Sequence, residues 1–569
     1  MDDTDTPQLS DATKASFQPI MKAIGAVRAQ LTDVKDVIAI RPGYQYPPEG
    51  KPVPAIVVAI RPGTSPVQAT ELQTRFGVPF TVIDATVEEQ LTVAQKAPVS
   101  FGTPGGSMVS ALETLLKGEA VLDFLPPKTG SYKEPDKSKL LLVNETMEMT
   151  ICVSPEAGWS ELETFLGETE STLTVAMYQF TAPHIFKAIE DAVTPAKRKF
   201  ELILHPVPEK PAKSGVKAND LNEQEDVIDP LDEKMKQRFE QTWATLISKK
   251  NPEGLFASAY HIKVAVRDST AVWLSSGNWQ SSNQPDVHPF VENPDDLPAG
   301  FQRKYNRDYH AIIKNDKLAS IYEFYIKRDF ELSAAQANQD VSFALPDLSP
   351  QPDLFVPIAP DEPVDFAKAP QLFKPLQLNR VVSVQPLLTP DNYAENALKL
   401  IKSAKKSVWF QNQYINFRGT DDDFAEFKLL VGALKEKIDE KKIEVRIICR
   451  DMMKQESLDV LIALDFPKEV FRFQPACHNK TIIVDGKVVM FGSHNWSNEG
   501  VKTNRDASLI FDDEEIAAYL AKVYDYDWTT LATAHPTKSR PRVAQADEAT
   551  PAGFKRVPAS SVSDDDGDG

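Results

Sequence analysis

The hydrophobic pattern near the start of the chain predicts one helix followed by short strands. A helix over 10–34 is indicated by apolar residues at helical spacing, namely Phe17, Ile20, Met21, Ile24, Val27 and Leu31. The runs 37–41, 55–61 and 80–86 have the length and β-branched content of strands. The first two share the sequence Ala-Ile-Arg-Pro-Gly, and Pro-Gly is a turn signal. We therefore expect a small α+β module over 1–140.

Two longer regions, 145–335 and 380–532, repeat one pattern of helices and strands. Each begins with a helix and a strand that leads to a tyrosine, Tyr178 or Tyr414, and continues with a helix and another apolar strand. Strands that alternate with helices are typical of an α/β sandwich with a mixed sheet. The sequence thus predicts an α/β protein with two pseudo-twofold-related sandwich domains and the N-terminal module.

Three segments lie outside this regular pattern. Residues 336–379 are rich in proline, which removes backbone donors and favours extended chain, so we interpret them as a linker. Residues 535–569 end in Ser-Asp-Asp-Asp-Gly-Asp-Gly and are predicted to be a disordered acidic tail. The first repeat carries extra segments near 210–235 and 280–305. Because the second of these directly follows the motif described next, we expect it to border the cleft and influence substrate choice.

Each repeat contains the same spaced set of polar residues, H-x-K-x4-D-x6-[GS]-S-x-N. The set comprises His261, Lys263, Asp268, Ser276 and Asn278 in the first copy and His478, Lys480, Asp485, Ser493 and Asn495 in the second. Six specified positions match by chance at about one in ten million starts, so two copies indicate a duplicated functional site. The tripeptide Asn-Arg-Asp follows in both repeats and ends at Asp308 and Asp506.

The spacing of the motif indicates a β-hairpin in each repeat. A histidine and a lysine two residues apart on a strand face the same side. Asp485-Gly486 is a hairpin signal, and a two-residue turn there would place Ser493 opposite His478. The same construction in the first copy places Ser276 opposite His261. Each hairpin would then present His, Lys, Ser and Asn on one surface.

These groups suit the chemistry of a phosphodiester. The two lysines supply positive charge, and the serines and asparagines supply hydrogen-bond donors, where negative charge develops on phosphate oxygens. Imidazole titrates near pH 6.5, so one histidine can attack while the other, protonated, donates to the leaving oxygen. A carboxylate can orient each ring. We expect Asp308 to serve His261 and Asp506 to serve His478.

The two motifs resemble the HKD signature of the phospholipase D superfamily in its single-chain form. The resemblance covers 145–532, and the stretch YQFTAPHIFKAI is similar to the small bacterial nucleases of that superfamily. It implies a reaction through a phosphohistidine without metal or cofactor, ending on water or another alcohol. It further implies that the motif His, Lys, Ser and Asn bind and attack phosphate, with His261 as nucleophile and His478 as acid. Asp268 and Asp485 would support the hairpins. The first copy departs from the pattern at Ser275 and Gly277.

Composition restricts the partners of the chain. The net charge is −19 and the pI about 5.0, so no global basic field attracts nucleic acid, although a local basic cleft suffices for an enzyme. Three cysteines lie far apart, without metal-ligand spacing or a disulfide framework. The acidic N-terminus does not resemble a secretion signal, and apolar runs are too short to span a membrane. A cytoplasmic protein is predicted.

The sequence therefore predicts a phosphoric diester hydrolase of phospholipase D type, with three substrate interpretations open. The acidic composition favours a phospholipid substrate and transient contact with a membrane surface. The nuclease-like stretch favours DNA or RNA. A catalytically silent binding or scaffold protein on the same fold is the non-enzymatic alternative. The partner of the N-terminal module is not indicated.

Overall fold

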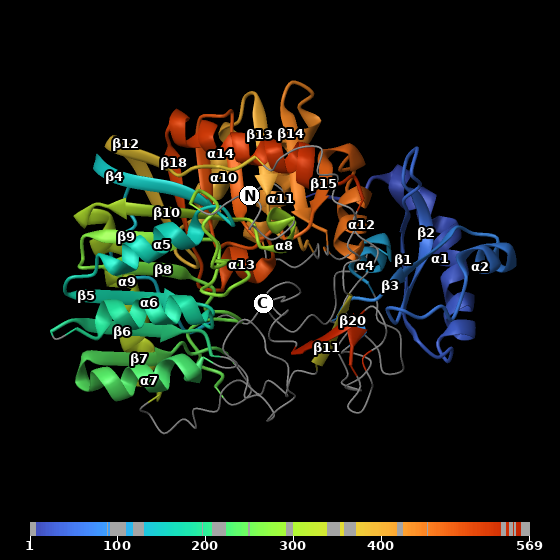
Figure 1. The fold of residues 1–569 in the computed structure, drawn as a ribbon. Coiled ribbons are helices and arrows are strands. Elements are labelled where there is room, and N and C mark those ends of the chain that lie inside the picture. The colour runs from blue at the N-terminus through green and yellow to red at the C-terminus, as the bar shows by residue number, and fades with distance from the viewer. Residues whose placement is uncertain are drawn as a thin grey trace.

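The computed structural model shows a mixed α/β protein, as predicted, and the residues that it describes form three sheets (Figure 1). Among the residues it describes, no helix combines the length and apolar character that crossing a bilayer requires. The cytoplasmic location stays a prediction. The described residues are 7–87, 89–90, 110–117, 130–195, 197–206, 224–247, 251–291, 300–337, 353–357, 371–417, 425–451, 453, 455–535, 542–544, 550 and 554–558.

The N-terminal region forms a small sheet of order β1-β2-β3, with one helix along it. Its elements are α1 (Asp11–Leu31), β1 (Val37–Gln45), β2 (Val53–Ile60), α2 (Ala69–Phe76), β3 (Phe80–Asp84) and α4 (Ala111–Lys117). The interpretation of both Pro-Gly pairs as turns is wrong for the first, because β1 continues through Pro42 to Gln45, with Pro42 opposite Ile56. Proline is tolerated there because β1 is an edge strand.

The N-terminal sheet packs against the second repeat. Tyr46 donates a hydrogen bond of 2.7 Å to Asp459, which lies on α12 (Gln455–Ala463). Apolar residues of α1, such as Phe17 and Ile24, belong to one buried cluster with residues of the second repeat such as Leu430. The described residues between 9 and 112 therefore share a core with the second repeat, and the proposed domain boundaries stay a prediction.

A single 14-stranded sheet runs through both repeats. From its centre outward, the first repeat contributes β4 (Val143–Ser154), β10 (Asp308–Lys314), β9 (Ala271–Ser275), β8 (Lys263–Arg267), β5 (Thr172–Met177), β6 (Lys199–Leu204) and β7 (Phe239–Trp243). The second repeat contributes, in the matching order, β12 (Leu376–Leu388), β18 (Ala507–Asp512), β17 (Val488–Gly492), β16 (Lys480–Val484), β13 (Ser407–Gln411), β14 (Glu444–Arg450) and β15 (Phe471–Gln474).

The order of strands is therefore the same in both directions from the central pair. Two separate sheets were expected, but β4 and β12 pair antiparallel and join the repeats into one. In each repeat the motif hairpin is antiparallel, whereas the three outer strands are parallel, which makes the sheet mixed. In Figure 1 the outer strands of the first repeat run across the view, β13 and β14 of the second run down it, and β12 lies beside β4.

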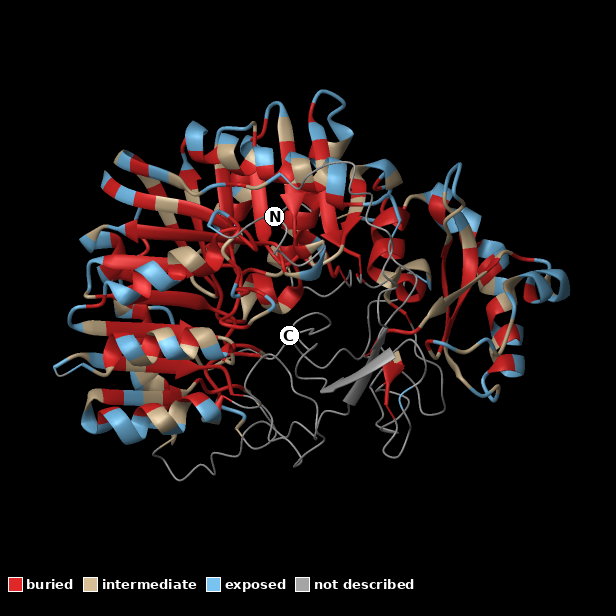
Figure 2. Cartoon of the chain, viewed as in Figure 1, coloured by how far each residue is buried: buried red, intermediate tan, exposed pale blue. Residues whose placement is uncertain are grey.

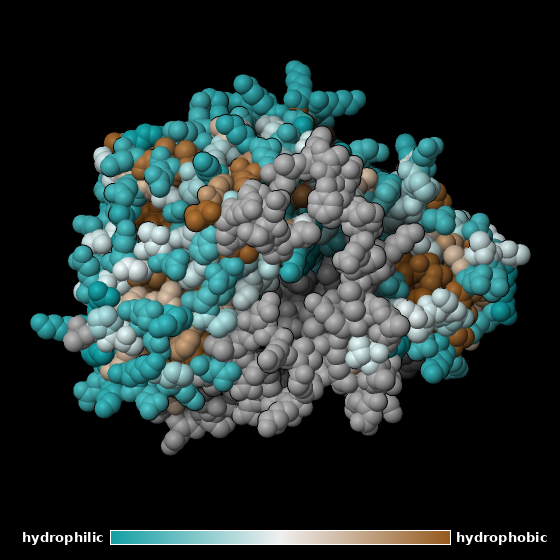
Figure 3. Space-filling model, viewed as in Figure 1, coloured by the Kyte–Doolittle hydropathy of each residue, from teal (hydrophilic) through white to brown (hydrophobic). Residues whose placement is uncertain are grey.

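Helices cover the sheet, and their outward faces carry most of the exposed positions, while the strands are largely buried (Figure 2). The first repeat has α5 (Gly158–Gly167), α6 (Pro183–Val193), α7 (Glu225–Met235), α8 (Phe301–Lys304) and α9 (Asp316–Ala337). The second has α10 (Tyr393–Ser403), α11 (Ala425–Asp439), α12, α13 (Asn498–Lys502) and α14 (Glu514–Tyr526). Hydrophilic residues cover most of the coloured surface in Figure 3, in keeping with the strong net charge.

The third sheet joins the proline-rich segment to the end of the chain. Its order is β19-β11-β20, with β19 at Arg542–Val543, β11 at Asp353–Pro357 and β20 at Phe554–Pro558. The prediction of a disordered tail is therefore wrong for these two tail segments, because each pairs with β11. The acidic end, 559–569, and most of the linker, 338–352 and 358–370, lie outside the described residues.

Candidate active site

Both motif hairpins have a turn one residue longer than the spacing suggested. β16 and β17 pair with Val484 opposite Val488, and β8 and β9 pair with Arg267 opposite Ala271. The prediction of a two-residue turn is wrong, and with it the placement of Ser493 opposite His478 and of Ser276 opposite His261. The reason lies in the turn itself, where two consecutive residues adopt positive φ and a third completes the reversal.

The motif aspartates lie in these turns and hold them against a neighbouring strand. The Asp485 carboxylate accepts hydrogen bonds from the backbone N–H groups of residues 405, 406 and 407, where β13 begins. The Asp268 carboxylate accepts from those of residues 170, 171 and 172, where β5 begins. Burial opposes ionisation, but these donors prevail and lower the pKa of both carboxyl groups. The two aspartates thus fix the position of each hairpin.

The two motif histidines are oriented by carboxylates from the opposite repeat. His261 Nδ1 lies 2.7 Å from an oxygen of Asp506, and His478 Nδ1 lies 2.6 Å from an oxygen of Asp308. The expected pairing within each repeat is therefore wrong, although the same four residues are used. Since both Nδ1 atoms are engaged, the Nε2 atoms are the ones left for chemistry.

Backbone contacts between the repeats explain this crossed pairing. The N–H groups of His478 and Asn479 donate to the carbonyl oxygen of Arg307, the residue before Asp308. In the other repeat the N–H of Arg505 donates to the carbonyl of Ala259, close to His261. Each Asn-Arg-Asp segment therefore runs beside the histidine segment of the other repeat, and its aspartate reaches the foreign ring.

The motif serines also contact these carboxylates. Ser276 donates a hydrogen bond of 2.7 Å to Asp308, and Ser493 donates one of 2.6 Å to Asp506. The serines thus position the histidine–aspartate pairs, and their direct binding of phosphate stays a proposal. Of the motif asparagines, Asn278 is fully buried and Asn495 is partly exposed.

The motif lysines lie beside the histidines and set the electrostatics of the site. Lys263 donates to the backbone carbonyl of His261, and Lys480 donates to that of His478 and lies 3.4 Å from its Nε2. Burial lowers the pKa of His478 to about 3, because the raising effect of Asp308 is smaller and Lys480 opposes it. Burial, both lysines and His478 also lower the pKa of His261. Charges from both repeats therefore act within one centre.

The aromatic surroundings differ between the two histidines. The Tyr178 ring lies 4.8 Å from the His261 ring, and Lys263 Nζ lies 4.8 Å from the centre of the tyrosine ring.

The predicted match of Tyr178 with Tyr414 is wrong by one residue. The bridges Phe180–Trp279 and Ile415–Trp496 align 180 with 415, so position 178 corresponds to Gln413.

Sequence reasoning missed two buried arginine clusters. Arg307 contacts Glu156 and Asp527, at 2.5 and 3.2 Å, and is fully buried. Arg505 contacts Asp329 and Asp391, at 2.6 and 2.7 Å, and is equally buried. In each cluster one carboxylate comes from the opposite repeat. The repeated Asn-Arg-Asp was a signal for the arginines, but nothing local in the sequence identifies their distant partners.

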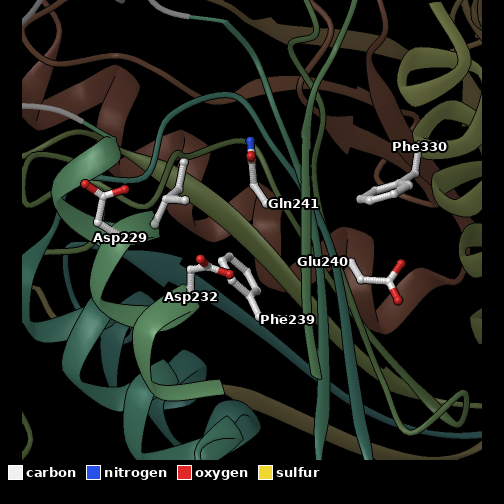
Figure 4. A pocket seen from close by; sticks show the side chains of 7 residues that line it. Asp229, Asp232, Phe239, Glu240, Gln241 and Phe330 are labelled. Carbon is white, nitrogen blue, oxygen red and sulfur yellow. The ribbon is translucent and has the colours of Figure 1, made fainter. Parts of the chain in front are cut away.

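A separate cavity lies away from this centre, at the edge strand β7 and the helix α7 (Figure 4). It is lined by Ile228, Asp229, Asp232, Phe239, Glu240, Gln241 and Phe330. Its described lining contains three carboxylates and no cationic side chain, and such a lining would repel an anionic diester. The first extra segment supplies its α7 wall, while 207–223 lies outside the described residues.

Comparison with known proteins places the second repeat in a family. Residues 397–528 match the family described as cardiolipin synthase, PLD-like domain. The chain is similar to cardiolipin synthase A of Pseudomonas entomophila, with 26% identity over 190 residues, which are 28% of this chain and 38% of that protein. It is also similar to the mitochondrial cardiolipin hydrolase of Canis lupus familiaris, with 36% identity over 61 residues, 11% of this chain and 23% of that protein.

The chain thus spans well under half the length of these relatives. Among solved structures, phosphatidylserine synthase of Haemophilus influenzae Rd KW20 superposes with a TM-score of 0.43 and 12% identity, over 68% of this chain and 88% of that one. The family match covers the second motif, and the first repeat contains the same motif in the same strand order. The comparisons therefore support a PLD-like domain over residues 397–528 of the second repeat.

Proposed function

We propose that the chain is a phosphodiesterase whose single active centre is shared by the two repeats. The observation that carries this proposal is the crossed pairing, in which each histidine is held at Nδ1 by an aspartate of the other repeat. Neither repeat alone contains a complete histidine–aspartate pair. Lys263 and Lys480 lie in the same buried centre and would neutralise the charge of a bound diester.

The reaction would proceed in two balanced steps. His261 Nε2 attacks phosphorus as the bond to the leaving oxygen breaks, its electron pair passes to that oxygen, and a proton moves there from His478 Nε2. The now neutral His478 then takes a proton from water or an alcohol. The oxygen of that molecule attacks phosphorus as the P–N bond breaks. Asp506 and Asp308 stabilise the imidazolium form of each ring in turn. Asn278 and Asn495 would donate to the phosphate oxygens.

A phospholipid is the substrate class we propose. The similar proteins are named for cardiolipin synthesis and cardiolipin hydrolysis, and an acidic chain of net charge −19 is poorly suited to a polynucleotide. A polynucleotide presents the same diester to the same histidines, and it is therefore an arm of the test. Transient contact with a membrane surface follows from a lipid substrate and is proposed with it.

One comparison tests the proposal. Wild type and His478→Ala are incubated with phosphatidylcholine vesicles, cardiolipin vesicles, single-stranded DNA, duplex DNA and RNA, with and without EDTA. We expect lipid turnover that is lost in the variant and unchanged by EDTA. Polynucleotide cleavage without lipid turnover would make the chain a nuclease. Absence of turnover on every diester would leave a binding or scaffold protein and refute the proposal.

A further inference from the structure

The two histidine–aspartate pairs differ in one side chain that only the first repeat supplies. Asn283 is fully buried in the segment after β9, four residues after Trp279, and the same place after Trp496 in the second repeat is Gly500, which has no side chain. Its Nδ2 donates a hydrogen bond of 2.9 Å to the second oxygen of Asp308 and lies 3.2 Å from His478 Nδ1. Together with Ser276 and His478, it gives that carboxylate three side-chain partners.

The matching carboxylate in the other pair lacks such a donor. Asp506 contacts His261 and Ser493 through one oxygen, and its other oxygen is buried without a hydrogen-bond partner among the described residues. Burial raises the pKa of Asp506, whereas His478 and Lys480 hold that of Asp308 below its usual range although burial opposes them. The two pairs are therefore electrostatically unequal.

Gly277 explains why Asn283 fits beside one carboxylate only. A Cβ at position 277 would lie 2.6 Å from the second oxygen of Asp308 and 3.1 Å from the Asn283 Cβ, so a side chain there would displace the amide. The second repeat has His494 at this position, and its ring stacks on Tyr393 with centroids 3.6 Å apart. The departure of the first motif from the common pattern thus creates the space that Asn283 occupies.

We propose that Asn283 is a positioning residue that makes His478 the proton donor of the centre. This inference rests on the proposed phosphodiesterase function. A donor on Asp308 favours the carboxylate form, so a proton held by the pair stays on the imidazole rather than passing to the carboxyl group. An imidazolium can protonate a leaving oxygen, whereas neutral imidazole beside a protonated carboxyl group is a very weak acid. The inequality assigns the acid role to one ring.

Other charged groups face the same pair and would be unchanged in the test. They are Lys480 on β16, Lys263 on β8, His310 on β10 and His261. Loss of the Asn283 donor removes stabilisation mainly from the state with net negative charge. The apparent pKa of the coupled Asp308–His478 pair should therefore rise.

The experiment compares Asn283→Ala, Asn283→Asp and a control in the same segment. Asp286 accepts from Trp159 Nε1 and is largely exposed, so Asp286→Ala perturbs the segment without touching Asp308. The His478 ring is titrated by NMR in histidine-labelled protein and assigned with His478→Gln. We expect the apparent pKa of the coupled pair to rise by at least half a unit in Asn283→Ala and further in the isosteric Asn283→Asp, while the ring of the singly protonated pair keeps more of the neutral-imidazole signal because the proton passes to Asp308. Asp286→Ala should change neither.

A kinetic readout accompanies the titration. In Asn283→Ala, kcat should fall at least tenfold for a diester with an alkyl leaving group and much less for bis(p-nitrophenyl) phosphate, whose leaving group needs no proton. An unchanged titration, or an equal change in Asp286→Ala, would overturn the role of Asn283. Failure of wild type to cleave any diester would instead refute the proposed function. The NMR titration would still decide whether Asn283 affects the Asp308–His478 pair.

Discussion

Replacing Asp506 by Asn tests the crossed pairing and the division of roles between the histidines. The carboxylate is almost fully buried and lies 2.7 Å from His261 Nδ1, so the substitution removes a charge-assisted hydrogen bond. Such a bond contributes about 1.5–3 kcal/mol. At about 1.4 kcal/mol per decade, kcat/KM should fall roughly 10- to 150-fold. The matched variant is Asp308→Asn, which acts on His478 in the same way.

The assay uses two diesters that differ only in the leaving group. Asp506→Asn weakens the nucleophile, so it should lower kcat/KM equally for a p-nitrophenyl and an alkyl leaving group. Asp308→Asn weakens the acid, so its loss should be largest with the alkyl group. Denaturation curves confirm that both variants are folded. The reverse pattern, with Asp308→Asn insensitive to the leaving group and Asp506→Asn sensitive to it, would refute the assignment.

Three further predictions concern stability and ligand binding. Arg505→Met leaves two buried carboxylates without their cation and should lower the unfolding free energy by about 3–5 kcal/mol. Arg380→Met should cost less than about 1 kcal/mol, because the Arg380 side chain is exposed to solvent, and equal losses in chemical denaturation would contradict this. The pKa values of four buried histidines are lowered to about 3 or 4, so the unfolded chain binds more protons below pH 6.5. The free energy of unfolding should therefore be highest above pH 6.5 and should fall by about 1.4 kcal/mol per pH unit for each histidine as the pH drops towards those values. Urea titrations at pH 7.5 and 5.5 would detect the difference. The four residues are His205, His310, His478 and His494. Inorganic phosphate bound between the motif lysines should raise the lowered histidine pKa values, so the protein should take up a proton from the buffer on binding. The heat of binding measured by calorimetry should then depend on the buffer, and a heat that is the same in all buffers would argue against this site.

Local patterns in the sequence predicted the elements well, because their signals lie within each element. The periodicity over 10–34 indicated α1, and the repeated motif indicated both hairpins and the strands before them. The four residues of the two histidine–aspartate pairs were also identified. Their partners were exchanged, however, because the crossing depends on how the two repeats pack, which no local spacing encodes.

Other errors have equally physical origins. The turn at Asp485 has one residue more than the Asp-Gly signal suggested, and an added turn residue shifts the register of every pair beyond it. Asn283 could not be found from the repeat, because it lies outside the shared motif and the matching position of the second repeat is Gly500. Arg307 and Arg505 were visible as repeats, but a buried ion pair requires knowledge of carboxylates far away in the sequence.

The pairing of β4 with β12 has a mechanical consequence for catalysis. Residues 376–384 align continuously with 143–151, so the repeats are joined by a backbone ladder rather than by a flexible hinge. Separating them would expose unpaired N–H and C=O groups along that seam. The spacing of the two imidazoles is thus built into the main chain, and we expect substrate and product to exchange while the two repeats stay together.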